Sequence, residues 1–381
     1  MSATLQRDAV SDGFATLQRH YDDPLLAART AHAEGAEIVG LTGVTIPVEL
    51  VLAAGRFPVL ITPKTDAPTP TADVYIEPVV SPETRALFED ALAGAFEFLD
   101  LLVLSRTDDK LYYYLKEMVR LGRGAKAPPL HMFDLMPSRR DAVRIYNRAA
   151  LDGLIDALER RADRPIADAA LSEAIALTNR RRALQRRLLE QRAAGRVAGS
   201  DAMQAIGAGY FMHPAAYVDA LRAWLGDLDA APPRAAVGPR LLVATSEPLS
   251  YLDLHWRIEA AGGFVAAEDD AWGARAPGGD IADGPPREAV FDKYWLDTAH
   301  SGVYPADARE AWVKAQAARD DVDAVVFYLP PSDHQFGWDY PRLAAYVAAL
   351  GKPALLLRQD ARDDAVADRI AAFVSDCGAG R

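Results

Sequence analysis

Two adjacent carboxylates, Asp108 and Asp109, stand where an apolar run at residues 101–104 gives way to an aromatic, amphipathic segment at 110–118. Acids in such a place are candidates for acid–base chemistry or for oxygen ligation of a metal. A purely local role is also open. Thr107 or Asp108 can cap the new helix, and Asp109 in the first turn suits the positive end of the helix dipole. The residues alone leave both roles open.

Further candidates stand in the loops that follow other apolar runs. In open parallel sheets, ligands bind just beyond the carboxyl ends of the strands, so these loops are the first places to search. The loops contain Thr42, Thr45, Ser81, Ser332, Asp333 and His334. The three early hydroxyls have an alternative role as helix caps, because a proline soon follows each. Asp333 and His334 are either a plain loop pair or acid–base groups that meet Asp108. The acids at 268–270 are predicted to be a polar strand exit and not a metal site.

The elements that position these loops follow from the pattern of apolar residues. Helices are predicted at residues 14–34, 47–54 and 83–98, and strands at 37–42, 57–61, 74–79, 101–104 and 130–133. Strands that alternate with helices require right-handed crossovers and a mostly parallel sheet. Residues 1–138 are therefore predicted to form a doubly wound α/β domain.

A helical connector is predicted at residues 139–235, because strand-like runs vanish there. Its long helical pattern is broken near Arg164 and Pro165, a shorter helix covers 214–225, and a linker lies at 230–239. Strands return at residues 240–246, 264–267, 324–329 and 354–357, with a Gly- and Pro-rich loop at 272–286. Residues 236–381 thus form a second α/β domain. The predicted fold class is α/β, with two doubly wound, flavodoxin-like parallel-sheet domains.

Composition restricts the classes of function. The chain has 381 residues and a net charge of -12, which disfavours a nucleic-acid partner. Neither a signal peptide nor a membrane span is apparent, so we expect a cytoplasmic protein. Cys377 is the only cysteine, which excludes an internal disulfide and any cysteine-held cluster or zinc site. No Gly-rich dinucleotide or phosphate loop and no Gly-x-Ser-x-Gly elbow is present.

Several segments, in their order along the chain, resemble one known family. They are IVGLTGVTIPVELVLAAGRFPVLI, YIEPVVSPETR, LLVLSRTDDKLYYYL, VVFYLPPSDH and GKPALLLRQDARDDAVADRIAAFV. Together they resemble the subunits of the 2-hydroxyacyl-CoA dehydratase and benzoyl-CoA reductase family, of the 2-hydroxyglutaryl-CoA dehydratase D-component type. Glu49 belongs to the Pro-x-Glu-Leu helix of that pattern. The family typically holds a [4Fe-4S] cluster on three cysteines. The matching positions here carry Ser81, Asp108 and the Pro-Pro-Ser stretch at 330–332.

The resemblance implies a subunit-like protein without its own [4Fe-4S] cluster or metal, which binds an acyl-CoA-type ligand in the cleft between the domains. Its partner would be a cluster-bearing paralogous subunit, in a hetero-oligomer, or a second copy in a homodimer, and no membrane is involved. If active in a complex, it would be a lyase component. The catalytic candidates are Asp108, Asp109 and His334, and the substrate-binding candidates are Thr42, Thr45, Glu49, Ser81, Ser332 and Asp333. Two alternatives stay open: a cluster-independent enzyme that uses Asp108, Asp333 and His334 as acid–base groups or metal ligands, and a non-catalytic scaffold or ligand-binding protein.

Overall fold

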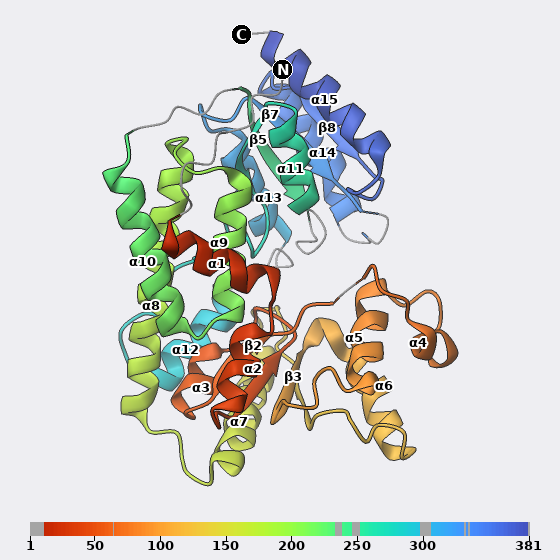
Figure 1. Ribbon diagram of the computed structural model, residues 1–381, viewed down its shortest axis with the longest axis vertical. Helices are drawn as coiled ribbons and strands as arrows, with labels where there is room; N and C mark the ends of the chain where they lie inside the picture. The colour runs from red at the N-terminus through yellow and green to blue at the C-terminus, as the bar shows by residue number, and fades with distance from the viewer. Residues whose placement is uncertain are drawn as a thin grey trace.

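Two four-stranded parallel sheets form the centres of the molecule (Figure 1). The computed structural model describes residues 11–63, 65–232, 238–245, 252–297, 306–330, 333 and 336–379. The first sheet contains β1 (Ile38–Leu41), β2 (Phe57–Leu60), β3 (Leu101–Ser105) and β4 (Leu130–Phe133). The second contains β5 (Arg240–Thr245), β6 (Phe264–Glu268), β7 (Ala324–Tyr328) and β8 (Ala354–Leu357). The predicted α/β fold class is confirmed.

The two sheets share one topology. Their strand orders are β2-β1-β3-β4 and β6-β5-β7-β8. In each sheet the chain moves first to one side of the starting strand and then to the other, so β1/β3 and β5/β7 are the topological switch points. The central strands β1 and β3 are buried along their whole length, as expected when helices cover both faces of a parallel sheet.

The helices of the first third of the chain come before and between the strands of the first sheet in sequence. They are α1 (Asp12–Asp22), α2 (Leu26–Ala33), α3 (Val48–Ala53), α4 (Pro70–Tyr75), α5 (Pro82–Ala93), the 3-10 turn η1 (Arg106–Asp108) and α6 (Asp109–Arg120). The predicted strand at 74–79 is wrong. Its first residues end helix α4, which starts at Pro70, and two of its apolar side chains, Val74 and Val79, are exposed. A short apolar run does not by itself separate a strand from a helix end.

Long helices occupy the middle of the chain, as predicted. They are α7 (Asp141–Ala162), α8 (Asp168–Ala193), α9 (Gly199–Phe211) and α10 (Pro214–Ala230). The predicted break near Arg164 is confirmed, and Asp163 adopts a left-handed conformation there, with a φ of 49°. Helix α9 was not predicted. It is buried almost all round and packs against β2 and β6, so it contacts both sheets.

The N-terminal helix α1 joins this helical group. It packs against α9 and α10, and their shared core contains Leu17, Ile206, Tyr217 and Leu221. Figure 1 shows α8, α9 and α10 running along one side of the molecule from the upper sheet to the lower one. The helices therefore hold the two sheets in one arrangement.

The remaining helices belong to the last third of the chain. They are α11 (Leu252–Ala260), α12 (Pro286–Leu296), α13 (Ala306–Ala317), α14 (Phe336–Ala349) and α15 (Asp364–Ala379). Helix α12 lies between β6 and β7 in sequence, but it packs against α7 and α8, close to the first sheet (Figure 1). Among the described helices, none combines the length and the apolar character that a bilayer crossing needs.

Candidate functional site

The switch point of the first sheet holds a carboxylate on a frame of hydroxyl groups. Thr42 follows β1, and Ser105 ends the neighbouring β3. Thr42 Oγ1 accepts a hydrogen bond from Ser105 N (3.0 Å) and donates to Asp108 Oδ2 (2.7 Å). Ser105 Oγ donates to the same carboxylate oxygen over 2.5 Å. A glycine at position 43 permits this packing, because a Cβ there would lie 2.9 Å from the Ser105 side chain.

Of the two roles left open for Asp108, its side chain does not fill the local one, capping of the helix. Asp108 occupies the N-cap position of α6, but its side chain makes no hydrogen bond to the helix amides. The prediction for Asp109 is confirmed, since this residue lies in the first turn, where it is exposed and its Oδ1 accepts from Lys110 N over 2.7 Å. The carboxylate of Asp108 is therefore bound across two strands and not within its own helix.

The environment of Asp108 favours its neutral form. Burial raises the pKa of Asp108 above the ordinary value, and the hydrogen bonds from Ser105, Thr42 and Thr107 offset only part of that effect. All three hydroxyls approach Oδ2. Its other oxygen, Oδ1, makes no hydrogen bond to any described residue. A half-buried acid with a raised pKa and one free oxygen can exchange a proton or bind a polar ligand group.

Of the other two cluster-ligand positions, Ser81 is a helix cap, and the stretch at 330–332 is described only at its first residue and is followed by the helix cap Asp333. Ser81 Oγ accepts from Thr84 N over 3.3 Å and caps α5, as predicted. Asp333 accepts from Phe336 N (3.1 Å) and Gly337 N (2.8 Å) at the start of α14. Ser332 and His334 lie outside the described residues. No hydrogen bond between described residues joins Ser81 to Asp108, so the structure does not bring the two predicted positions together through a direct bond.

The loop after β1 leads to a fully buried glutamate. Thr45 is half-buried, and the helix it precedes begins without a side-chain cap, so the predicted capping by Thr42 or Thr45 is wrong.

Glu49, in that helix, is fully buried, with 0% of its surface exposed. Its Oε1 accepts from Arg182 Nη2 (2.8 Å) and Thr178 Oγ1 (2.7 Å), and its Oε2 accepts from Tyr294 Oη (2.7 Å).

These contacts make Glu49 the centre of a buried polar network. Burial alone would raise the pKa of Glu49, but the Arg182 guanidinium and the two hydroxyls outweigh it and lower that pKa. The network joins α3 to α8 and α12. Sequence reasoning missed it, because Arg182 and Tyr294 are 133 and 245 residues away from Glu49 in sequence.

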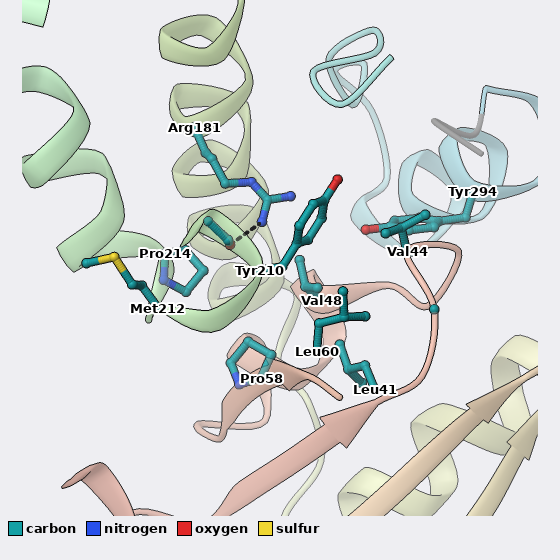
Figure 2. A pocket seen from close by; sticks show the side chains of 12 residues that line it. Leu41, Val44, Val48, Pro58, Leu60, Arg181, Tyr210, Met212, Pro214 and Tyr294 are labelled. Carbon is teal, nitrogen blue, oxygen red and sulfur yellow. Dashed lines mark hydrogen bonds between the residues drawn. The ribbon is translucent and has the colours of Figure 1, made fainter. Parts of the chain in front are cut away.

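A small pocket lies beside the same loop. It has a volume of about 30 Å³, and its walls come from the end of β1, from β2, and from α8, α9 and α12. Figure 2 shows the Arg181 side chain reaching from α8 to the ring of Tyr210, with Val44 and Tyr294 on the other side. This space holds roughly two water molecules. It is too small for a whole acyl-CoA.

A second group of buried charges lies at the carboxyl end of β6. Glu268 pairs with Arg192 over 2.5 Å, and Asp269 pairs with Arg275. Asp270 is 1% exposed, and burial raises its pKa to about 7. The prediction of a polar strand exit is therefore wrong in one respect, since these acids are buried. The part of the chain that the structure describes contains no group of His, Cys, Asp and Glu side chains suited to a metal.

An iron–sulfur cluster does not fit the donor atoms at the family's ligand positions. Such clusters need thiolates. Ser81 instead caps a helix, Asp108 is bound by hydroxyls, and the stretch at 330–332 carries prolines and a serine. Cys377 lies on α15, where it packs against the hydrophobic core.

Comparison with known proteins agrees with this architecture. Residues 44–375 match the family described as 2-hydroxyglutaryl-CoA dehydratase, D-component. The chain is 20% identical over 334 residues to the beta subunit of (R)-phenyllactyl-CoA dehydratase from Clostridium sporogenes, covering 86% of this chain and 87% of that one. It is 27% identical over 352 residues to the "Putative dehydratase subunit YjiM" of Escherichia coli (strain K12), covering 88% of each. Because the match spans most of the sequence, the chain belongs to the 2-hydroxyglutaryl-CoA dehydratase D-component family.

Proposed function

We propose that this chain is a dehydratase subunit that binds an acyl-CoA-type ligand between its two α/β domains without an iron–sulfur cluster of its own. The observation that carries the proposal is Asp108, a family ligand position that here presents a carboxylate at the β1/β3 switch point. Family membership and the name of the Clostridium sporogenes relative, a dehydratase beta subunit, support a place in a complex. A single cysteine supports the absence of a cluster.

In this function the chain supplies binding and positioning, and a cluster-bearing partner supplies electron chemistry. The free Oδ1 of Asp108 and the backbone at the end of β1 offer polar contacts to the ligand at the edge of the sheet. Because Thr42 and Ser105 donate to Oδ2, the remaining oxygen, Oδ1, can accept a hydrogen bond from a hydroxyl group of the ligand.

Purification from the native host tests the partner. We expect a second protein of the same family to co-purify, with iron and sulfide in that protein and a CoA ester in the complex. Recovery of the chain as an isolated homo-oligomer without either would contradict the proposal.

Titration of the purified chain with a short 2-hydroxyacyl-CoA tests the site. We expect Asp108→Asn to weaken binding roughly tenfold through the loss of an ionisable partner, while the unfolding free energy changes by less than about 1 kcal/mol. Asp109→Asn, its exposed neighbour, is the matched control and should bind normally. Equal binding by the two variants would remove Asp108 from the site.

One observation favours a second candidate, acid–base catalysis at Asp108 without any cluster. The pKa of this carboxyl is raised by burial, and its Oδ1 makes no hydrogen bond to a described residue. If this candidate is correct, the isolated chain turns over an acyl-CoA substrate with a pH dependence that Asp108→Asn abolishes. Asp333 is less suited to share the task, because both of its oxygens accept helix amides.

A further inference from the structure

Arg181 is a buried cation without a carboxylate partner among the described residues. Its side chain lies on α8 and the residue is 9% exposed. Nη1 makes one long hydrogen bond, 3.5 Å, to the carbonyl oxygen of Gly209, and Nε has no hydrogen-bond partner within the described part of the chain. On the same helix, Arg182 pairs with Glu49 and Arg192 with Glu268. A buried charge is costly unless it is paired, so the exception at Arg181 needs an explanation.

The guanidinium of Arg181 borders the small pocket beside β1 (Figure 2). Among the residues that line this pocket, Arg181 alone carries a charge. The two lining phenols already donate elsewhere, Tyr294 to Glu49 and Tyr210 to the carbonyl of Ala271. The rest of the wall is mainly aliphatic: Leu41, Val44, Val48, Leu60 and Met212.

We infer that this pocket is a binding site for a small aliphatic carboxylate, with the anion on Arg181 and the alkyl group against the aliphatic wall. One guanidinium balances one negative charge, and its planar fork matches the two oxygens of a carboxylate. The volume of about 30 Å³ limits the ligand to the size of acetate or propionate. A phosphate group would need several more donors than this wall supplies.

The inference does not rest on the proposed function, because acetate binding requires neither a CoA ester nor a partner subunit. The two sites are nevertheless neighbours. Gly43 lines the pocket, and the preceding residue, Thr42, binds Asp108.

Calorimetric titration of the full chain with sodium acetate and sodium propionate, at constant ionic strength, tests the site. We expect saturable binding of one anion per chain, and roughly tenfold weaker binding by Arg181→Met, which keeps the apolar stem and removes the charge. Arg181→Lys should bind with intermediate affinity, because it keeps the charge and loses the fork. Arg180→Gln, an exposed residue on the same helix, is the matched control and should bind like the wild type.

Three results would overturn the inference. They are the absence of saturable acetate binding to the wild type, equal affinity of the wild type for chloride, and normal acetate binding by Arg181→Met. If Arg181→Met does not fold, Val44→Phe fills the pocket from its half-buried loop and leaves Arg181 in place. Undiminished acetate binding by that variant would likewise overturn the inference.

Discussion

Thr42 and Asp108 are 66 residues apart in sequence, and a 2.7 Å hydrogen bond joins Thr42 Oγ1 to Asp108 Oδ2. The same Thr42 oxygen accepts from Ser105 N, so one hydroxyl connects the end of β1, the end of β3 and the carboxylate. This bond fixes Asp108 at the point where ligands bind in open parallel sheets. Positioning of the acid therefore depends on Thr42 as much as on the helix that carries the acid.

Thr42→Val should destabilise the protein. The substitution keeps the shape of the side chain but removes the donor to Asp108 and leaves the Ser105 amide without its acceptor, at a cost of about 1–3 kcal/mol. Urea unfolding measures this free energy. Thr45→Val is the matched control, and we expect it to change stability by less than about 0.5 kcal/mol. A similar loss in both variants would show that the hydrogen bonds of Thr42 are unimportant.

The isolated chain should not assemble an iron–sulfur cluster. Anaerobic reconstitution with iron and sulfide should leave no stoichiometric metal on the protein, because its one thiol, Cys377, lies on α15 and the family's ligand positions carry other atoms. Cys377→Ser should behave identically in metal analysis and absorption spectra. A cluster in the wild type that disappears in Cys377→Ser would contradict this expectation.

Glu49→Gln should cost far more stability than an ordinary surface change. Glu49 and Arg182 form a buried ion pair with an N–O distance of 2.8 Å. The hydroxyl groups of Thr178 and Tyr294 donate hydrogen bonds to the same carboxylate. Removal of one partner leaves a buried cation unpaired, at about 3–5 kcal/mol. Chemical unfolding provides the measurement.

The double variant Glu49→Leu/Arg182→Leu provides the control for this pair. Replacement of both partners by apolar groups leaves no lone buried charge, so it should cost less than Glu49→Gln alone. Glu117→Gln, which removes the exposed partner of the exposed Arg120, should leave the unfolding free energy nearly unchanged. If Glu49→Gln proves as mild as Glu117→Gln, the network does not stabilise the fold.

Much of the fold could be predicted because each strand of a buried parallel sheet corresponds to a short run of apolar residues that are adjacent in sequence. The strand β4 at 130–133 and the strand β8 at 354–357 were predicted to the residue. The error at 74–79 has a local cause, since a proline at position 70 starts a helix whose apolar residues look like a strand. Helix α9 escaped prediction because it is buried nearly all round and shows little polar periodicity.

The candidate site was only partly predictable, because its bonds connect distant parts of the chain. Strand-end reasoning selected Thr42 and Asp108 correctly as neighbours of one sheet edge. The sequence did not indicate whether Asp108 caps its helix or accepts a hydrogen bond from Thr42 on the neighbouring strand, because that choice depends on the register of β1 and β3. Arg181 and Arg182 stood in a run of arginines on a helical pattern, where nothing local distinguishes a buried guanidinium from a solvated one.

Asp270→Asn should stabilise the protein at neutral and alkaline pH. Burial raises the pKa of Asp270 to about 7, and one of its oxygens has no hydrogen-bond partner among the residues that the structure describes. The ordinary value for an unfolded chain is about 3.9. Between these two pH values the folded state binds the proton and the unfolded state does not, so stability falls as pH rises through this window. The amide has the shape of the neutral acid and does not ionise, so the gain at pH 8 should be on the order of 1–4 kcal/mol.

Unfolding free energies measured from pH 5 to pH 8 check this expectation. This range lies above the lowered pKa values of Glu49 and Glu268, whose contributions are lost only as pH falls through those values. The difference between Asp270→Asn and the wild type should grow with pH and level off above pH 7. Asp269→Asn is the control with the opposite sign, because Asp269 pairs with Arg275 and Arg309 and its loss leaves the buried guanidinium of Arg275 without its carboxylate. A wild type whose stability relative to Asp270→Asn does not change with pH would show that Asp270 is ionised throughout and that its burial is compensated by groups outside the contacts described above.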